Sequence, residues 1–434
     1  MDYKEDGYET SIVAPLQPST QIWGDNNAAT GCAPGVSPCT DVNDYLVAGD
    51  ALILENNVPL PRDASTILYD GGDMVQASYP IAVTRGVHSG GSPGALLGGA
   101  VEVSNTKSWG QNFRAPVGRS MGDDITNAYT LTDMYIQASE ENTQVTVPGG
   151  PYEITKPDGS TVVISNTDPN ISQVFTIGQG ETLRIEKIKV GDLITTSKPA
   201  QVDLVTGDLG SNYEMRWYSL LPEEQWTSDY YTPLSEDRSR VYMYNPNGFS
   251  ITVNVYMQND NYGSPSDTVN IGANSHGKFL LPSETSAYRF ESTDGVFFGV
   301  TQTDDYQSGQ RWDWGHPLIP ADNLTSKVVV GLAYGCKNNA CPSGTNNPPN
   351  PVWIAPADGP AIITVDYNSD GTDVDTFNNV DKLESLVVKG RAPLLDMTGA
   401  TISALDTSGN EIDLAVAWGQ KHDWALSETY NLDM

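Results

Sequence analysis

The chain has 434 residues, of which 55 are acidic and 23 basic, so its formal net charge is −32 at neutral pH. This charge opposes unaided binding to nucleic acid or to an anionic lipid surface, because phosphate groups repel it. No apolar run reaches the roughly 18 residues of a membrane-spanning helix, and we expect no membrane span. The length allows about three domains or one large repetitive domain.

The composition is typical of strands and turns. The chain contains 41 Gly, 28 Pro and 21 Tyr residues, and short apolar runs alternate with polar ones. Residues 182–186 and 251–256 show this alternation clearly, whereas helical periodicity is almost absent. The sequence therefore predicts an all-β fold of antiparallel sheets.

The first residues, MDYKED, lack the basic and apolar regions of a secretory signal peptide, so a secreted chain would carry its signal outside this sequence. The four cysteines form two local pairs, Cys32 with Cys39 and Cys336 with Cys341, both in Gly- and Pro-containing segments. We expect two disulfides, which indicate an oxidising compartment. Free thiols or one zinc site are the alternatives, although the spacing suits zinc poorly.

Four segments share one order of features: a strand that ends in apolar residues, a polar tip, a loop and a phrase centred on Trp. The period is about 100 residues, and it predicts internal repeats. The four segments read SYPIAVTRG with NTKSWGQNFRAP, SKPAQVDLVTGD with PEEQWTSDYYTP, STDGVFFGVTQTDD with QRWDWGHPLIP, and GNEIDLAVAWGQ with KHDWALSETY.

Each repeat is expected to open with two strands, and four divisions follow from the pattern. The expected opening strands are 133–139, 240–245 and 351–355, and the second strands are 143–147, 250–256 and 361–366. The expected divisions are an N-terminal segment with repeat 1 (1–125), repeat 2 (126–236), repeat 3 (237–322) and repeat 4 (323–434). Two arrangements remain open, a β-propeller-like closed array or tandem β-sandwiches.

The tryptophans of the repeated phrases allow two interpretations. Aromatic faces can stack on sugar rings, but a Trp that recurs at one point of a repeat more commonly packs neighbouring repeats together. We therefore expect packing between repeats, with ligand stacking as the alternative. The residues concerned are Trp109, Trp226, Trp312, Trp314 and Trp424.

An acidic turn in the last repeat carries the clearest ligand pattern. Asp366, Asn368 and Asp370 place oxygens at positions 1, 3 and 5, Gly371 allows the sharp turn, and the Thr372 carbonyl follows. This is the first half of a calcium loop, although position 12 is not Glu and no helical pattern flanks the turn. Asp373 or Asp375 would complete a Ca²⁺ site; the alternative is a solvated turn.

Signals for catalysis are few. The four histidines, His88, His276, His316 and His422, have no paired metal-ligand spacing, and neither a nucleophile elbow nor a phosphate-binding loop is present. We therefore expect a protein that is not an enzyme and has no catalytic residues.

Several longer phrases resemble a known kind of module. ALILENNVPLPR, YDGGDMVQASYPIAVTRG, AVEVSNTKSWGQNFRAPVG, YEMRWYSLLPEEQW and VDYNSDGTDVDTFNNVDKLESLVV resemble the N-terminal module of giant secreted bacterial surface proteins with adhesin-like repeats. The module is also distantly similar to the N-terminal domain of IgGFc-binding proteins. The resemblance covers residues 23–424 and implies a cell-surface location without assigned catalysis. Those relatives carry a turn closer to DYDGDGT, so Asn368 and Ser369 imply weaker calcium affinity here.

The expectation is thus a secreted, acidic, non-catalytic structural or adhesive module of a cell-surface assembly or extracellular filament, stabilised by calcium. Its partners would be other copies or modules of a surface protein, and glycans in the alternative of a carbohydrate-binding module. A glycosidase-like propeller is the second alternative. Residues 8–16 and 424–434 resemble two halves of one Trp phrase. We expect the two ends to pair within one molecule, or between molecules in a filament.

Overall fold

The structure is a computed structural model of the chain and contains strands and short 3-10 turns. It describes residues 2–3, 47–51, 73–75, 77, 79–87, 99–121, 129–168, 170–207, 215–234, 236, 239–258, 264–282, 285–303, 314–333, 351–392 and 395–419. No α-helix occurs in these residues, and none of them forms a helix that could span a membrane. The prediction of an all-β class with antiparallel sheets is confirmed.

The first group of strands forms a nine-stranded sheet in which one long strand has different partners in its first and last parts. This strand, β12 (Leu193–Gly207), pairs through its first part with β5 and β7 and through its last part with β6 and β13. The other members are β5 (Gly110–Arg114), β6 (Leu131–Ala138), β7 (Thr143–Val147), β8 (Tyr152–Thr155), β9 (Thr161–Ile164), β10 (Gln173–Ile177), β11 (Thr182–Glu186) and β13 (Met215–Ser219).

The second group consists of two sheets with the orders β17-β16-β19-β14-β22 and β18-β15-β20-β21. Alternating burial along β16 and β19 shows that one face of the first sheet is turned to a core. The strands are β14 (Asp229–Thr232), β15 (Arg240–Asn245), β16 (Ile251–Met257), β17 (Asp267–Ile271), β18 (Ser275–Leu280), β19 (Tyr288–Ser292), β20 (Phe298–Gln302), β21 (Gly315–Pro317) and β22 (Ile319–Pro320).

The third group also consists of two sheets, with the orders β23-β28-β25-β26 and β27-β24-β29. Both contribute to one buried cluster, which includes Ile354 of β24 and Ile363 of β25. The strands are β23 (Lys327–Val329), β24 (Val352–Pro356), β25 (Ala361–Asp366), β26 (Val374–Val380), β27 (Leu386–Val388), β28 (Thr401–Asp406) and β29 (Leu414–Trp418).

The strand orders of the three groups correspond. One side of each group reads β5-β12-β7-β10, β14-β19-β16-β17 and β23-β28-β25-β26, and the other reads β13-β12-β6-β11, β21-β20-β15-β18 and β29-β24-β27. The edge strands β5 and β14 precede the expected boundaries at residues 125 and 236, yet they pair with strands that follow those boundaries. Each of these two groups therefore takes one edge strand from the preceding stretch of sequence.

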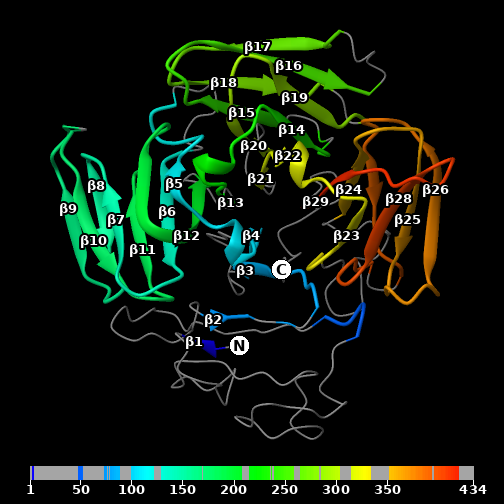
Figure 1. Ribbon diagram of the computed structural model, residues 1–434, viewed down its shortest axis with the longest axis horizontal. Coiled ribbons are helices and arrows are strands. Elements are labelled where there is room, and N and C mark those ends of the chain that lie inside the picture. Colours follow the sequence, from blue (N-terminus) through cyan, green and yellow to red (C-terminus); the bar gives the residue numbers. More distant parts are fainter. Residues whose placement is uncertain are drawn as a thin grey trace, which may run out of the picture.

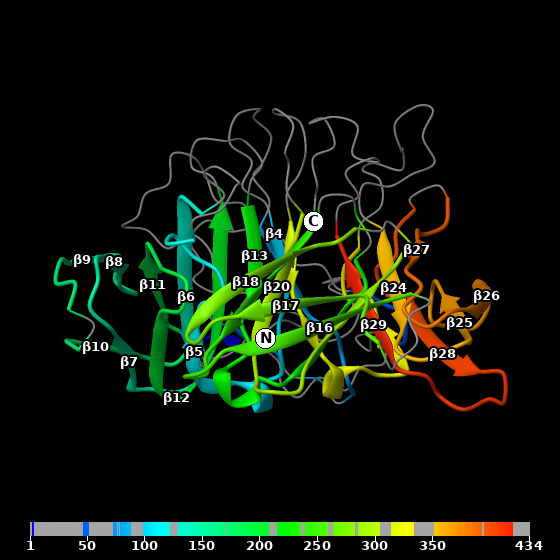
Figure 2. The same ribbon diagram turned by 90° about the horizontal axis from the view of Figure 1, so that it is seen from above.

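Figure 1 shows the three groups in an arc, with β5–β12 on the left, β14–β20 at the top and β23–β29 on the right. The hairpin of β3 (Thr84–Val87) and β4 (Gly99–Glu102) lies toward the middle, where β4 contacts β13. Figure 2 shows the same strands from above. The short pair β1 (Asp2–Tyr3) and β2 (Asp73–Met74) completes the strands of the described residues.

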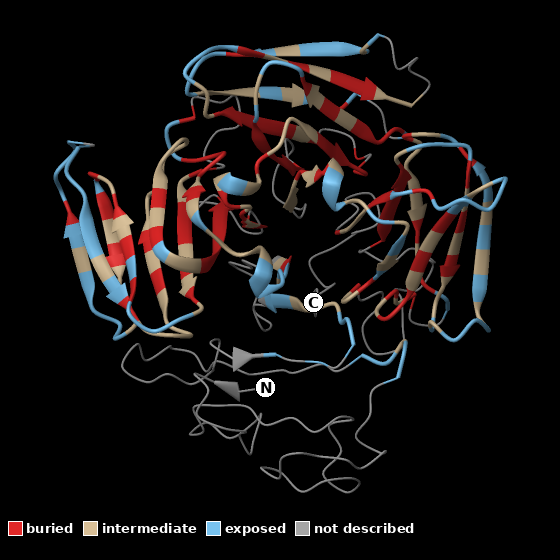
Figure 3. Ribbon diagram, in the orientation of Figure 1, coloured by how far each residue is buried: buried red, intermediate tan, exposed pale blue. Residues whose placement is uncertain are grey.

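One buried core runs through the first and second groups, and a separate cluster fills the third. Figure 3 shows buried residues on the strands between the sheets and exposed residues on the outer strands β9, β17 and β26. A third, smaller cluster joins the second group to the third and contains Tyr231, Tyr256 and Leu383. The core thus continues across the boundaries between groups.

Candidate functional site

The acidic turn between β25 and β26 is closed by its own hydrogen bonds. The Asp366 Oδ2 atom accepts a hydrogen bond of 2.8 Å from the Gly371 N–H group. Asp370 Oδ1 accepts bonds from the N–H (2.8 Å) and hydroxyl (2.6 Å) groups of Thr372, and these bonds lower the pKa of Asp370. Gly371 has a φ of +81°, which a residue with a side chain adopts only with strain.

The two carboxylates that follow the turn bind an arginine. Arg391 donates to Asp373 Oδ1 (3.2 Å) and Asp375 Oδ1 (2.7 Å), and its guanidinium lies 4.6 Å from the centre of the Tyr367 ring. The Tyr367 hydroxyl donates to Asp375 Oδ2 at 2.9 Å. Burial, reinforced by this carboxylate, raises the pKa of Tyr367. Arg391 therefore neutralises part of the charge predicted to attract a cation.

Because Arg391 binds Asp373 and Asp375, the candidate calcium ligands that remain are those of the turn itself. Within the described residues, no three His, Cys, Asp or Glu side chains come together as metal ligands. The Asp366 Oδ1 atom, however, is buried and accepts no hydrogen bond. A bare carboxylate oxygen beside Asn368 and Asp370 fits a calcium ion, which accepts amide and backbone oxygens as ligands as well as carboxylates. Asp373 and Asp375 fit less well because Arg391 binds them.

The predicted disulfides of Cys32 with Cys39 and of Cys336 with Cys341 lie outside the described residues. The same holds for Trp312, Trp424, His88 and His422.

Trp109 and Trp226 occupy the same position in two similar turns. Each follows a 3-10 turn, η2 (Thr106–Ser108) or η3 (Glu223–Gln225). The indole N–H of Trp109 donates to the Ser104 carbonyl at 3.1 Å, and that of Trp226 donates to Leu221 at 3.0 Å, five residues earlier in both cases. Trp226 is 7% exposed and stacks on Phe298, with 5.3 Å between ring centres. Trp226 therefore packs against Phe298 of β20.

Trp314 does not share this position. It lies just before β21 and stacks on Trp353 of β24 at 5.3 Å. The third turn of this kind, η4 (Ala321–Asn323), is followed by Leu324. Trp314 therefore differs from Trp109 and Trp226 in its position relative to the turns, and it contacts the third group through Trp353. The sequence carries a signal for the third turn, because PADNLTS at 320–326 repeats the pattern of PEEQWTS at 222–228.

The first junction joins η3 to the edge strand β5. Arg114 donates to Glu223 Oε1 at 2.5 Å, and both side chains are about one-fifth exposed. The Asn112 amide donates to Glu224 at 2.5 Å, and Gln225 donates to the Ser108 carbonyl. These bonds link the edge of the first group to the turn that leads into the second. The contact is close, since a Cβ on Gly110 would lie 2.3 Å from Pro222.

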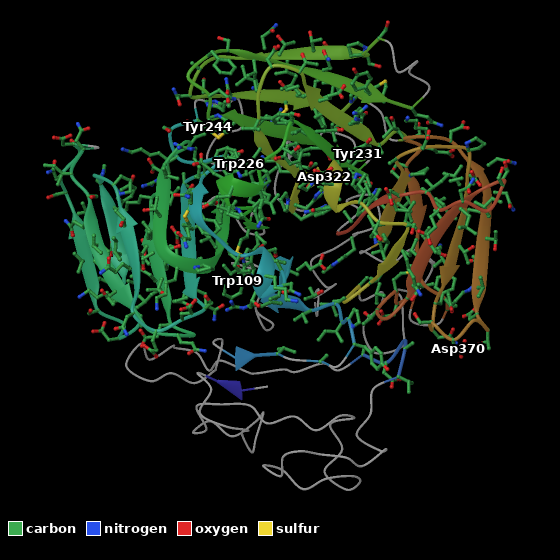
Figure 4. All side chains as sticks on the ribbon, viewed as in Figure 1. Trp109, Trp226, Tyr231, Tyr244, Asp322 and Asp370 are labelled. Carbon is green, nitrogen blue, oxygen red and sulfur yellow. The ribbon has the colours of Figure 1, made fainter. Side chains whose placement is uncertain are left out.

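The second junction repeats this arrangement with different residues. The turn η4 contacts the edge strand β14, and Tyr231 of β14 pairs with Ile319 in front of that turn. Arg289 donates to both carboxylate oxygens of Asp229, at 2.8 and 2.7 Å, and its guanidinium lies over the Tyr231 ring. Figure 4 shows Trp109, Trp226 and Asp322 on the inner side of the groups, whereas Asp370 lies at the outer end of the third.

Backbone contacts strengthen the second junction. The Ala287 N–H group donates to the Leu383 carbonyl at 2.8 Å, and the Ser385 N–H group donates to Thr285 at 3.0 Å. The Ser385 hydroxyl donates to the Pro233 carbonyl at 2.6 Å. These bonds bring together residues about 100 to 150 positions apart in the sequence, so the second and third groups share a bonded boundary.

His316 of β21 lies beside the second junction, and its imidazole ring is kept neutral by burial. Its ring nitrogens lie 2.7 Å from the Pro317 carbonyl and 3.2 Å from the Thr232 hydroxyl, and its ring stacks on Trp314. Burial lowers its pKa to about 4. Because a carbonyl accepts from one ring nitrogen, the other accepts from Thr232. This environment suits a packed histidine better than a general base at neutral pH.

Comparison with known proteins adds no assignment. No family model matches the chain, and neither the curated proteins nor the solved structures include a match to it.

Proposed function

We propose that this chain is a non-catalytic structural or adhesive module of a cell-surface or extracellular assembly. The observation that carries the proposal is the junction that occurs twice, η3 on β5 and η4 on β14. The Arg114–Glu223 ion pair at the first junction and the backbone bonds at the second fix one group of sheets to the next. Such fixed boundaries suit a module that holds a constant shape.

The corresponding strand orders support internal repeats arranged as tandem sandwiches around a common centre. Each unit binds its neighbour through one kind of surface. The same kind of surface would bind other copies or modules of a surface protein. The net charge of −32 favours solubility and disfavours nucleic acid as a partner. Secretion is the location consistent with the proposed disulfides.

Calcium is the proposed stabilising ion. The support is the buried Asp366 Oδ1 atom without a hydrogen-bond donor, in a turn where Asn368 and Asp370 supply further oxygens. The bound ion would hold the connection between β25 and β26, at the outer end of the third group. No catalytic role is proposed for it.

The test uses the purified full-length chain on a glycan array and with a panel of polysaccharides and chromogenic glycosides. We expect no turnover above the blank and no saturable glycan binding at submillimolar concentration. Turnover that disappears when one carboxylate is changed would establish an enzyme instead. Saturable binding that is lost in Trp109→Ala but kept in Trp226→Phe would establish a carbohydrate-binding module, since Trp109 is the more accessible ring.

A further inference from the structure

The hairpin of β3 and β4 packs on the first group of sheets. Val101 of β4 is 6% exposed and lies in one buried cluster with Val205 of β12 and with Met215 and Trp217 of β13. The Arg85 guanidinium of β3 lies 5.6 Å from the centre of the Trp217 ring. Both strands of the hairpin therefore contact the inner strand β13.

Arg85 also supplies a positive charge to a buried carboxylate of the first group. Asp203 of β12 is 5% exposed, and the Gln201 amide donates to its Oδ1 atom at 3.3 Å. Burial raises the pKa of Asp203, and the charge of Arg85 offsets part of that rise. A buried carboxylate is costly without an opposite charge, so the hairpin completes the environment of Asp203.

The start of the same hairpin contacts the third group. Gly331, two residues after β23, lies so close to β3 that a Cβ there would be 2.8 Å from Thr84 Oγ1 and 3.2 Å from Ala82 Cβ. Thr84 is the first residue of β3 and directly precedes Arg85. Figure 1 shows the hairpin between the first group and β23. Neighbouring residues of one strand thus contact the first and the third group.

An earlier segment contacts the third group as well. Residues 47–51 form a turn in which Gly49 has a φ of +91°. A Cβ on Gly49 would lie 2.0 Å from the Asn368 carbonyl oxygen, and a Cβ on Gly399 would lie 2.5 Å from the Gly49 carbonyl oxygen. The chain therefore meets the third group at residues 47–51 and again at residues 82–84, before the strands of the first group begin.

We propose that residues 47–51 and the β3–β4 hairpin act as a clasp that fixes the third group to the first, so that the three groups form a closed ring. The junctions of η3 with β5 and of η4 with β14 are the other two links of this ring. Because Thr84 and Arg85 are adjacent, loosening the clasp at the third group also loosens it at the first. This inference concerns closure of the fold and does not depend on the proposed function.

A pair of introduced cysteines tests the closure in the full-length chain. Thr84→Cys combined with Gly331→Cys places two Cβ atoms within reach of the about 3.5 to 4.5 Å that a disulfide requires. We expect mild oxidation to cross-link this pair in the monomer, isolated by size exclusion and mapped by mass spectrometry of peptides. Thr84→Cys combined with Gly248→Cys is the matched control and should not cross-link, because a Cβ on Gly248 has no atom within 4 Å.

Hydrogen exchange with mass spectrometry tests the coupling between the two ends of the clasp. Gly331→Val pushes a side chain against Thr84, so amides of β3 and β4 should exchange at least about tenfold faster, and those of β13 should also exchange faster. Gly248→Val adds the same side chain where a Cβ meets nothing, and it should leave the exchange of all three strands unchanged.

A second matched pair tests the contact of residues 47–51. Gly49 and Gly409 both have a positive φ, +91° and +87°, so a change to Ala strains the backbone at either position. Only at Gly49 would the new Cβ also meet another segment. Gly49→Ala should therefore speed amide exchange in residues 396–401, whereas Gly409→Ala should not.

Three results would overturn the proposal. The first is failure of Thr84→Cys with Gly331→Cys to cross-link in a monomer that circular dichroism shows to be folded. The second is cross-linking of that pair only between two copies, since a second molecule would then supply the hairpin. The third is unchanged exchange of β13 in folded Gly331→Val, since the two ends of the clasp would then be independent. The cross-link decides closure even if Gly331→Val does not fold.

Discussion

Replacing Trp226 tests whether the junction stabilises the whole molecule. The side chain is 7% exposed, stacks on Phe298 and donates to the Leu221 carbonyl. Trp226→Ala should lower the free energy of unfolding by about 3 to 5 kcal/mol, the usual cost of emptying a buried Trp site. Trp226→Phe keeps most of the ring and should cost about 1 kcal/mol beyond the change in ring size, for the lost hydrogen bond.

Trp109→Ala is the matched control, because Trp109 follows an equivalent turn and makes the same indole bond while remaining partly accessible. We expect Trp109→Ala to cost less than half as much stability as Trp226→Ala, because the Trp109 side chain buries less apolar surface on folding. Guanidinium unfolding followed by circular dichroism measures all three variants, with the m-values compared. Equal losses for the two Trp→Ala variants, or a loss below about 1 kcal/mol for Trp226→Ala, would refute the reasoning.

Four further predictions follow. A double-mutant cycle on Arg114 and Glu223 should give a coupling free energy of about 1 to 2 kcal/mol in unfolding experiments, and zero coupling would remove this pair from the junction. Because His316 has a folded pKa of about 4 against about 6.5 when unfolded, stability should fall as pH drops from 6.5 to 4, and His316→Gln should flatten that slope in pH-dependent melting. Calcium should raise the melting temperature of the wild type but not of Asp370→Ala; an equal rise in both would place the ion elsewhere. Intact mass after alkylation without reduction should show no modified cysteine, whereas four modified thiols would disprove both disulfides.

The sequence was most informative for strands with a clear local pattern of apolar residues. The expected strands at 143–147 and 240–245 have the same bounds as β7 and β15, and those at 133–139 and 351–355 differ from β6 and β24 by at most two residues. Burial alternates along β7 and along the second half of β6, whereas β15 and β24 are short apolar runs buried almost throughout, and both local patterns predict strands.

Features set by distant contacts were harder to predict. Leu324 replaces Trp at the third turn, and an apolar contact there can be made by either side chain, so a search for Trp missed it. Arg391 binds Asp373 and Asp375 from a segment that follows β27, and no local pattern indicates that contact. The pairing of β5 and β14 with later strands also depends on tertiary contacts, so it could not be read from the period of the repeats.

Scanning calorimetry on the full-length chain tests most directly whether the junctions join the groups of sheets into one structural body. The account predicts a single transition whose calorimetric and van't Hoff enthalpies agree, because unfolding one group removes contacts that the next one needs. Weakening the first junction with Arg114→Ala should broaden or divide that transition. Separate peaks in the wild type, or a calorimetric enthalpy well above the van't Hoff value, would contradict the account, since the groups would then unfold independently.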